Sequence, residues 1–216
     1  MRQLILDIRP DSPPDFDNYL PGPNTEVLAA LRAHLPGERE PLLYLWGESG
    51  VGKSHLARAW ASSVGAALYA AGNLPEPPVP ALAVDDVEML AADDPVRLFN
   101  LINAARELGG LLLICATLPP AQLTLRPDLA TRLAQGLVFR LHPLADSDKL
   151  AALSVRAEGR GLRLPDEVAR YLLTHSRRDL PRLLASVDAL DTFSLSRKRP
   201  VSVPLLKEML QLRQSR

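Results

Sequence analysis

Apolar residues in the first two thirds of this chain fall into short continuous runs rather than strict alternation. The runs are PLLYLW at 41–46, ALAV at 81–84 and GLLLICAT at 110–117. Continuous runs of this length predict strands that are buried on both faces, as in a parallel sheet covered by helices. A further strand is predicted to end near Leu141, and HLARAWASSVG at 55–65 has the spacing of a helix with a glycine stop.

The pattern changes after Pro143, where the strand signals end. Later segments pair a Ser or Asp start signal with apolar residues at three- and four-residue spacing, which predicts helices. These segments are 145–161, 164–176, 178–196 and 201–214. The sequence therefore predicts an α/β domain with a parallel sheet at 14–143 and a small all-helical domain at 144–216, preceded by a separate N-terminal segment at 1–13.

Composition narrows the class of protein. The 216 residues carry 25 basic and 25 acidic side chains and no net charge, whereas proteins that bind nucleic acid by charge alone are usually basic. The four histidines and single cysteine show no metal-ligand spacing, and Cys115 lies in an apolar run, as expected of a small core residue. Apolar runs are too short for a membrane span, and Asp7 and Arg9 interrupt any secretory signal. We expect a cytoplasmic protein without a membrane partner.

The segment GESGVGKS has the spacing G-x-x-x-x-G-K-S of a phosphate-binding loop, and it lies between a predicted strand and a predicted helix. Its glycines let backbone N–H groups turn toward a phosphate chain, and the N-terminus of the following helix adds positive potential. Lys53 can reach the β- and γ-phosphates of a nucleoside triphosphate, and the Ser54 hydroxyl can bind Mg²⁺. The predicted nucleotide-binding residues here are Gly47, Glu48, Ser49, Gly50, Val51, Gly52, Lys53, Ser54 and His55.

Polar residues also follow two other predicted strands. Asp85 and Asp86 come directly after ALAV, and Thr117 ends GLLLICAT. Ligands of open parallel sheets bind at the carboxyl ends of the strands. Asp85 is the predicted second Mg²⁺ residue, and Asp86 could orient or deprotonate an attacking water, although Asp86 also suits the N-cap of a following helix. A polar group at Thr117 would lie beside the γ-phosphate.

In combination these motifs resemble the DnaA/Hda family of AAA+ proteins. The resemblance extends over nearly the whole chain. It includes NYLPGPNTEVLAAL at 18–31, the acidic pair, DLATRL at 128–133 and the helical end. It implies a AAA+ P-loop NTPase domain followed by a helical lid domain, with ADP or ATP and Mg²⁺ as cofactors.

The resemblance also implies roles for residues that nothing local distinguishes from solvated surface side chains. Arg132 matches the arginine finger, which enters the nucleotide site of a neighbouring subunit. The sensor-2 arginine maps onto Arg178, with Arg182, one turn later, as the alternative. Thr117 departs from the acidic residue common at this place in DnaA. The segment that packs by the adenine ring in this family supplies Tyr19, Leu20 and Asn24.

The N-terminal segment QLILDI resembles the clamp-binding peptide Q-L-x-L-x-L of the same family. Its leucines would fill an apolar pocket on the DNA polymerase III sliding clamp (beta subunit), and its glutamine would supply a directional hydrogen bond. The prolines that follow would form a stiff spacer. From composition alone, an ordinary edge strand remains an open interpretation. The matching residues are Gln3, Leu4, Leu6 and Ile8.

The implied function is regulatory. Bound to the clamp on DNA, the chain would present Arg132 to ATP held by DnaA and promote hydrolysis of that ATP, with at most weak ATPase activity of its own. DNA contact would be indirect, and a homodimer or homo-oligomer stays open. DnaA initiators continue into a helix-turn-helix domain, for which we expect no room after the lid. The competing classes are a DnaA-like initiator or helicase loader acting on single-stranded DNA, and a self-contained ATPase or small-molecule kinase.

Overall fold

The computed structural model describes the chain in two compact units that meet in the sequence after Pro143. The described residues are 13–34, 40–70, 72, 74–91, 93–175 and 179–214. Several predicted site residues lie outside these ranges, namely Gln3, Leu4, Leu6, Ile8 and Arg178.

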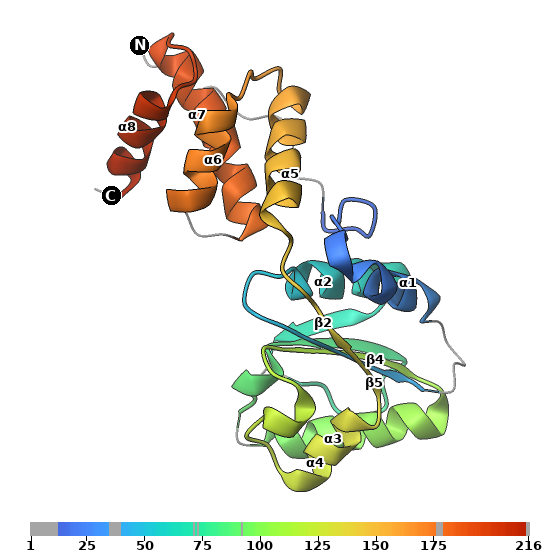
Figure 1. Ribbon diagram of the computed structural model, residues 1–216. Helices are drawn as coiled ribbons and strands as arrows, with labels where there is room; N and C mark the ends of the chain where they lie inside the picture. The colour runs from blue at the N-terminus through green and yellow to red at the C-terminus, as the bar shows by residue number, and fades with distance from the viewer. Residues whose placement is uncertain are drawn as a thin grey trace. The chain divides into compact units, whose positions relative to one another are not determined.

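The first unit is built on a parallel sheet, as the apolar runs predict. Within the described residues, five strands form one sheet in the order β2-β3-β4-β1-β5, and every neighbouring pair is parallel (Figure 1). The strands are β1 (Leu42–Trp46), β2 (Ala67–Ala70), β3 (Ala81–Asp85), β4 (Leu111–Ala116) and β5 (Leu137–Arg140). The most buried pairs, β1 with β4 and β3 with β4, occupy the centre, where both faces are covered.

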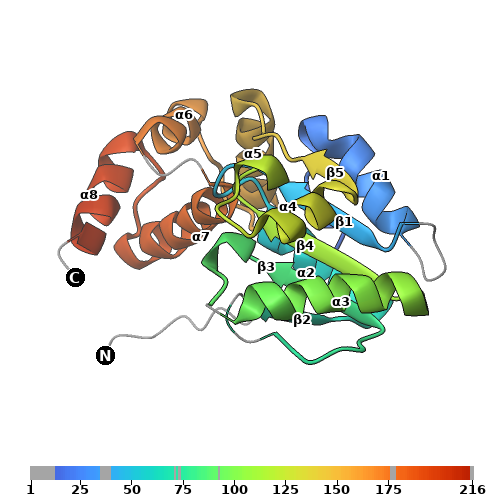
Figure 2. The ribbon, with the colours of Figure 1, turned by 90° about the horizontal axis from the view of Figure 1, so that it is seen from below.

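Helices cover both faces of this sheet, so two cores form on either side of the strands. Helices α1 (Thr25–Ala33) and α2 (Lys53–Val64) lie on one face, and α3 (Asp94–Leu108) and α4 (Pro127–Ala134) lie on the other (Figures 1 and 2). Successive side chains of a strand point to opposite faces. Accordingly, Leu43 and Leu45 of β1 pack with α1 and α2, while Leu42 packs with α3 and α4. This two-sided burial explains why the strands read as unbroken apolar runs.

Three elements of this unit were not predicted. Strand β2 escaped because it is short, lies at the edge and leaves Ala67 and Ala70 exposed, so it lacks a buried run. The segment that forms helix α1 is distinguished in the sequence only by its family resemblance, and no helix is predicted there. Helix α3 does carry a helical signal, because Leu98, Leu101 and Ile102 are buried at three- and four-residue spacing behind a proline at the start of the helix.

The parallel order brings the carboxyl ends of β1, β3 and β4 to one edge. Short 3-10 turns follow two of these strands: η2 (Val87–Met89) lies after β3, and η3 (Pro120–Gln122) lies after β4. A third, η1 (Gly22–Asn24), leads into α1. The phosphate-loop sequence, the acidic pair and Thr117 therefore share one edge of the sheet, which is the usual ligand position of such folds.

The second unit is entirely helical over its described residues, as predicted. It contains α5 (Asp146–Gly159), α6 (Asp166–His175), α7 (Leu180–Arg197) and α8 (Val203–Gln214). Apolar side chains from all four helices form its core. Arg156 makes a two-bond ion pair with Asp188, at 2.8 and 2.7 Å, which links α5 to α7 at the margin of this core. No helix of the described segments has the length and apolar character to cross a membrane.

Gly136, which precedes β5, provides a test of how tightly this edge strand is packed. A Cβ at this position would lie 2.8 Å from the carbonyl oxygen of Leu42 and 2.7 Å from its Cγ. Gly136→Ala should therefore reduce the free energy of unfolding by about 1–3 kcal/mol, because the clash involves backbone. The measurement is chemical denaturation followed by circular dichroism.

The matched control is Gly159→Ala at the end of α5, where an added Cβ meets nothing within 4 Å. This change should be neutral or slightly stabilising, since alanine favours a helix over glycine. Equal stability of the Gly136→Ala variant and the unmodified protein would contradict the packing described here.

Candidate functional site

The loop between β1 and α2 has the backbone conformation of a phosphate cradle. Gly50 and Gly52 have φ values of 83° and 104°, which side-chain-bearing residues rarely adopt. A Cβ on Gly52 would also lie 2.8 Å from Cε2 of Tyr19. Glu48, Ser49 and Gly50 are exposed. The loop thus presents backbone to solvent at the N-terminus of α2, where N–H groups and the helix dipole favour an anion.

Lys53 is the buried charge of this loop. The residue is only 6% exposed, and its Nζ donates to the carbonyl oxygens of Gly47, at 2.7 Å, and Glu48, at 3.1 Å. Within the described residues no carboxylate forms an ion pair with it. A buried ammonium without a carboxylate in direct contact is costly, so its surroundings suit an anionic ligand such as a phosphate chain.

The segment before α1 packs directly on the phosphate loop. The rings of Tyr19 and His55 lie with centroids 5.5 Å apart, tilted by 47°, and Nε2 of His55 is 2.9 Å from the carbonyl oxygen of Asp15. Burial raises the pKa of the Tyr19 hydroxyl, with a hydrogen bond from Asn24 acting in the opposite direction. Leu20 is exposed, at 38%. These contacts set an aromatic and apolar surface beside the loop.

Asn24 ties this segment to the chain that follows β5. The residue is 1% exposed. Its Nδ2 donates to the carbonyl oxygen of His142 at 2.9 Å, and its Oδ1 accepts from the backbone N–H of His142 at 2.7 Å. One side chain thereby satisfies both backbone groups of a residue 118 positions away. The structure therefore gives Asn24 a structural contact in addition to its predicted place near the base.

The acidic pair lies at the end of β3, where the charge of Lys53 acts on Asp86. Asp86 has φ 53° and occupies the position before η2, but its side chain caps no backbone N–H of that turn. Its own N–H donates to Oδ1 of Asp85 at 3.1 Å. Partial burial raises the pKa of the Asp86 carboxyl, the charges of Asp85 and Glu88 raise it further, and Lys53 lowers it. The N-cap alternative for Asp86 is therefore not supported by side-chain geometry.

Thr117 is held by residues that the sequence reasoning missed. Its backbone N–H donates to Oε1 of Glu88 at 3.1 Å. The carbonyl of the following residue, Leu118, accepts from the Tyr44 hydroxyl at 2.7 Å. Burial raises the pKa of Tyr44 far above its usual range, and the nearby charge of Glu88 contributes. Tyr44 therefore remains a hydrogen-bond donor at neutral pH. Glu88 follows the acidic pair by two residues, and this spacing is the only signal that could have drawn attention to it.

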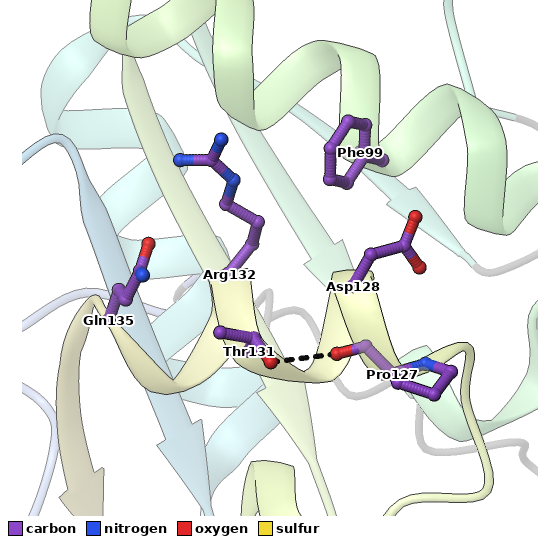
Figure 3. A pocket seen from close by; sticks show the side chains of 6 residues that line it. All are labelled: Phe99, Pro127, Asp128, Thr131, Arg132 and Gln135. Carbon is purple, nitrogen blue, oxygen red and sulfur yellow. Dashed lines mark hydrogen bonds between the residues drawn. The ribbon is translucent and has the colours of Figure 1, made fainter.

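Arg132 lies apart from these groups, on helix α4. It lines an open hollow of about 470 Å³ between α3 and α4, where its guanidinium lies 5.7 Å from the centroid of the Phe99 ring (Figure 3). Asp128, also in the hollow, is bonded instead to Arg126 at 2.8 Å. Within the described part of the chain, no carboxylate pairs with Arg132. The other residues lining the hollow are Pro127, Thr131 and Gln135.

Arg182, the alternative sensor-2 residue, belongs to the helical unit. It lies in the first turn of α7, where its N–H donates to the capping carboxylate of Asp179 at 3.1 Å and its Nε approaches the same side chain at 3.5 Å. Its side chain is 60% exposed. The assignment of the sensor-2 arginine therefore stays a prediction.

The predicted Mg²⁺ residues supply an incomplete set of ligands by themselves. Ser54 lies in the first turn of α2, and Asp85 ends β3. No cluster of three or more His, Cys, Asp or Glu side chains that could hold a metal occurs in the described segments. One hydroxyl and one carboxylate nevertheless fit Mg²⁺ in nucleotide sites, where phosphate oxygens and water supply most of the ligands.

Comparison with known proteins places this geometry in context. Residues 146–210 match the family model described as Hda, lid domain. The fold resembles domain III of the Thermotoga maritima replication initiation protein DnaA, with a TM-score of 0.74 and 22% identity over 94% of this chain and 98% of that one. It also resembles AMPPCP-bound DnaA from Aquifex aeolicus, with a TM-score of 0.70 and 18% identity over 84% and 66% of the two chains. A point mutant of Thermotoga maritima RuvB gives a TM-score of 0.71 and 16% identity over 93% and 73%.

The parallel sheet with this strand order, the glycine-rich loop after β1 and the helical second unit give the chain the fold of DnaA domain III. The match to the Hda lid domain covers the helical unit, and the likeness of the chain to DnaA domain III is one of fold.

The raised pKa of Asp86 leads to a prediction about stability. The ionised carboxylate of Asp86 is disfavoured in the folded protein. The folded protein therefore loses stability as the pH rises through the folded-state pKa of this group. Asp86→Asn should therefore raise the melting temperature at pH 7–8, in the absence of nucleotide and Mg²⁺. The rise should be no more than about 2 °C because solvent screens the repulsion, and it should shrink as the pH falls through the raised pKa of this carboxyl.

Thermal melting followed by circular dichroism at several pH values gives the measurement. Asp93→Asn is the control: Asp93 is exposed at the start of α3, and asparagine is an equally good residue there. A lower melting temperature of Asp86→Asn at pH 8 would contradict the electrostatic description of this edge.

Proposed function

We propose that this chain is a regulatory AAA+ adaptor that binds the DNA-loaded sliding clamp and promotes hydrolysis of ATP held by DnaA. The resulting ADP-bound DnaA would be inactive, and a second initiation of chromosome replication would be prevented. The observation that carries the proposal is the position of Arg132. Helix α4 packs on the face of the sheet opposite to α2, and Arg132 lines a hollow that contains no residue of the phosphate loop.

The surroundings of Arg132 suit a group that acts on a partner. Its guanidinium contacts the Phe99 ring without a carboxylate partner in the described residues, so docking would not have to break an ion pair. A guanidinium that enters the nucleotide site of DnaA would stabilise the negative charge that develops on the γ-phosphate during hydrolysis. Arginine fingers contribute about 10³–10⁵-fold to the rate of such reactions.

The chain's own nucleotide, ADP or ATP, would serve mainly to hold the protein in a binding-competent state. The phosphate chain would lie on the loop at Lys53 and Ser54, and Mg²⁺ would be held by Ser54 and Asp85. The buried ammonium of Lys53, which donates to loop carbonyls and pairs with no carboxylate of the described residues, supports this assignment, as does the left-handed backbone at Gly52. When bound, Mg²⁺ would neutralise part of the negative charge of the phosphates. Tyr19 and Asn24 would supply the surface beside the base.

Stimulation of DnaA is tested with one assay and a small set of variants. Labelled ATP bound to DnaA is incubated with DNA-loaded clamp and each form of this protein. Arg132→Ala should lose stimulation by at least about a hundredfold while it still binds ADP and the clamp.

Lys53→Ala should instead weaken binding of ADP by about tenfold to a thousandfold, because a charge-assisted contact to phosphate is lost.

Arg58→Ala is the matched control, because Arg58 is an exposed arginine of α2 on the opposite face of the sheet. It should stimulate hydrolysis normally. Full stimulation by Arg132→Ala would overturn the finger assignment. Absence of stimulation by the unmodified protein would overturn the adaptor function and favour a DnaA-like initiator or helicase loader that acts on single-stranded DNA.

Clamp binding is tested separately at the N-terminus. The double substitution of Gln3 and Leu4 by alanine should abolish binding to the clamp, because it removes both the hydrogen-bonding side chain and one apolar anchor. Nucleotide affinity should change by less than about twofold and the melting temperature by less than about 1 °C. A titration against the clamp and a melting curve give these values.

Asp7→Ala is the control, since Asp7 occupies a variable position of Q-L-x-L-x-L. It should bind the clamp normally. A large fall in melting temperature on replacing Gln3 and Leu4 would identify the segment as part of the folded core and contradict its role as a docking peptide.

A further inference from the structure

Glu88 makes a contact that the sheet itself does not supply. The pairing of β3 with β4 ends at Val84 and Ile114. On the other side of β4, the carbonyl of Ala116 accepts from the N–H of Gly47 at 3.2 Å. The N–H of Thr117 belongs to the same trans peptide group as the Ala116 carbonyl and points in the opposite direction, so it faces the side where β3 has ended. Oε1 of Glu88 takes the place of the missing strand and accepts from this N–H at 3.1 Å.

The second oxygen of this carboxylate has no evident structural use. Oε2 of Glu88 is buried and makes no hydrogen bond to any of the described residues, and burying an acceptor without a partner costs stability. The side chain also adds negative charge beside Asp86, which already carries the charge of Asp85 as a neighbour. Packing therefore does not explain a carboxylate here. Glu88 lies between the acidic pair and the end of β4, at the edge of the sheet that the phosphate loop also occupies.

We propose that Glu88 is a positioning residue that fixes Thr117 at the place of the γ-phosphate and thereby sets how the site distinguishes ATP from ADP. This inference rests on the proposed binding of a nucleotide at the phosphate loop. Glu88 accepts from the N–H of Thr117, the Tyr44 hydroxyl donates to the carbonyl of Leu118 at 2.7 Å, and the N–H of Gly47 donates to the carbonyl of Ala116. The backbone is thus bonded on both sides of Thr117, which gives its side chain a defined position.

Glu88→Met tests the role of the acceptor. Methionine has a similar length and keeps the site filled, so it avoids a cavity. Loss of the hydrogen bond to Thr117 should weaken binding of the ATP analogue AMPPCP by about tenfold, while ADP affinity changes by less than about twofold. Calorimetric titration of both nucleotides with Mg²⁺ measures the ratio. Glu88→Gln, which retains an amide oxygen for the same N–H, should restore the ratio to within about twofold of the unmodified protein.

A double-mutant cycle with Thr117→Val shows whether the two residues act together. Valine removes the hydroxyl and preserves the shape and the backbone N–H. If Glu88 acts through Thr117, combining Glu88→Met with Thr117→Val should weaken AMPPCP binding no more than Thr117→Val alone, within about twofold. Glu88→Ala replaces Glu88→Met in the cycle if the methionine variant does not fold.

Additive losses of AMPPCP affinity would overturn the inference, because they would show that Glu88 acts independently of Thr117. Equal losses of AMPPCP and ADP affinity would also overturn it and leave Glu88 with a purely structural contact. If the unmodified protein binds neither nucleotide, the proposed function fails together with the inference. The binding of ADP and AMPPCP by the unmodified protein therefore separates the two cases.

Discussion

The pairing of β1 with β4 is the interaction on which the candidate site depends. It joins Leu42–Trp46 to the strand from Leu112 to Ala116 in continuous register, and it continues beyond β1 through the bond from Gly47 to Ala116. All core residues of β4 are fully buried or nearly so, so the pair can shift little without opening both cores. The first residue of the phosphate loop and the end of β4 are consequently fixed relative to each other before any ligand binds.

The sequence was informative where burial and local spacing carry the signal. The central strands β1, β3 and β4 are buried on both faces, and their continuous apolar runs predict them. The helices of the second unit have one apolar face each, which gives them their three- and four-residue spacing. The phosphate loop is a local motif whose conformation depends on its own glycines, so the spacing of Gly47, Gly52 and Lys53 was sufficient to predict the loop.

Residues that act across the sheet could not be found in the same way. Glu88 meets Thr117, which lies 29 positions later, and Tyr44 meets Leu118 over 74 positions. Neither pair has a local pattern, because each contact exists only once β3, β1 and β4 lie side by side. The ring of Phe99 beneath Arg132 is a further example, since it depends on α3 packing against α4. Edge elements such as β2 are also hard to predict, because partial exposure removes the continuous apolar run.

The bond pattern of Asn24 has a mechanical consequence. Its amide binds both backbone groups of His142, which immediately precedes the link into the helical unit, and the same amide nitrogen reaches the Tyr19 hydroxyl at 3.5 Å. One side chain therefore joins the aromatic surface beside the phosphate loop to the peptide at His142. Asn24 and His142 are consequently held together, although 118 positions separate them in the sequence.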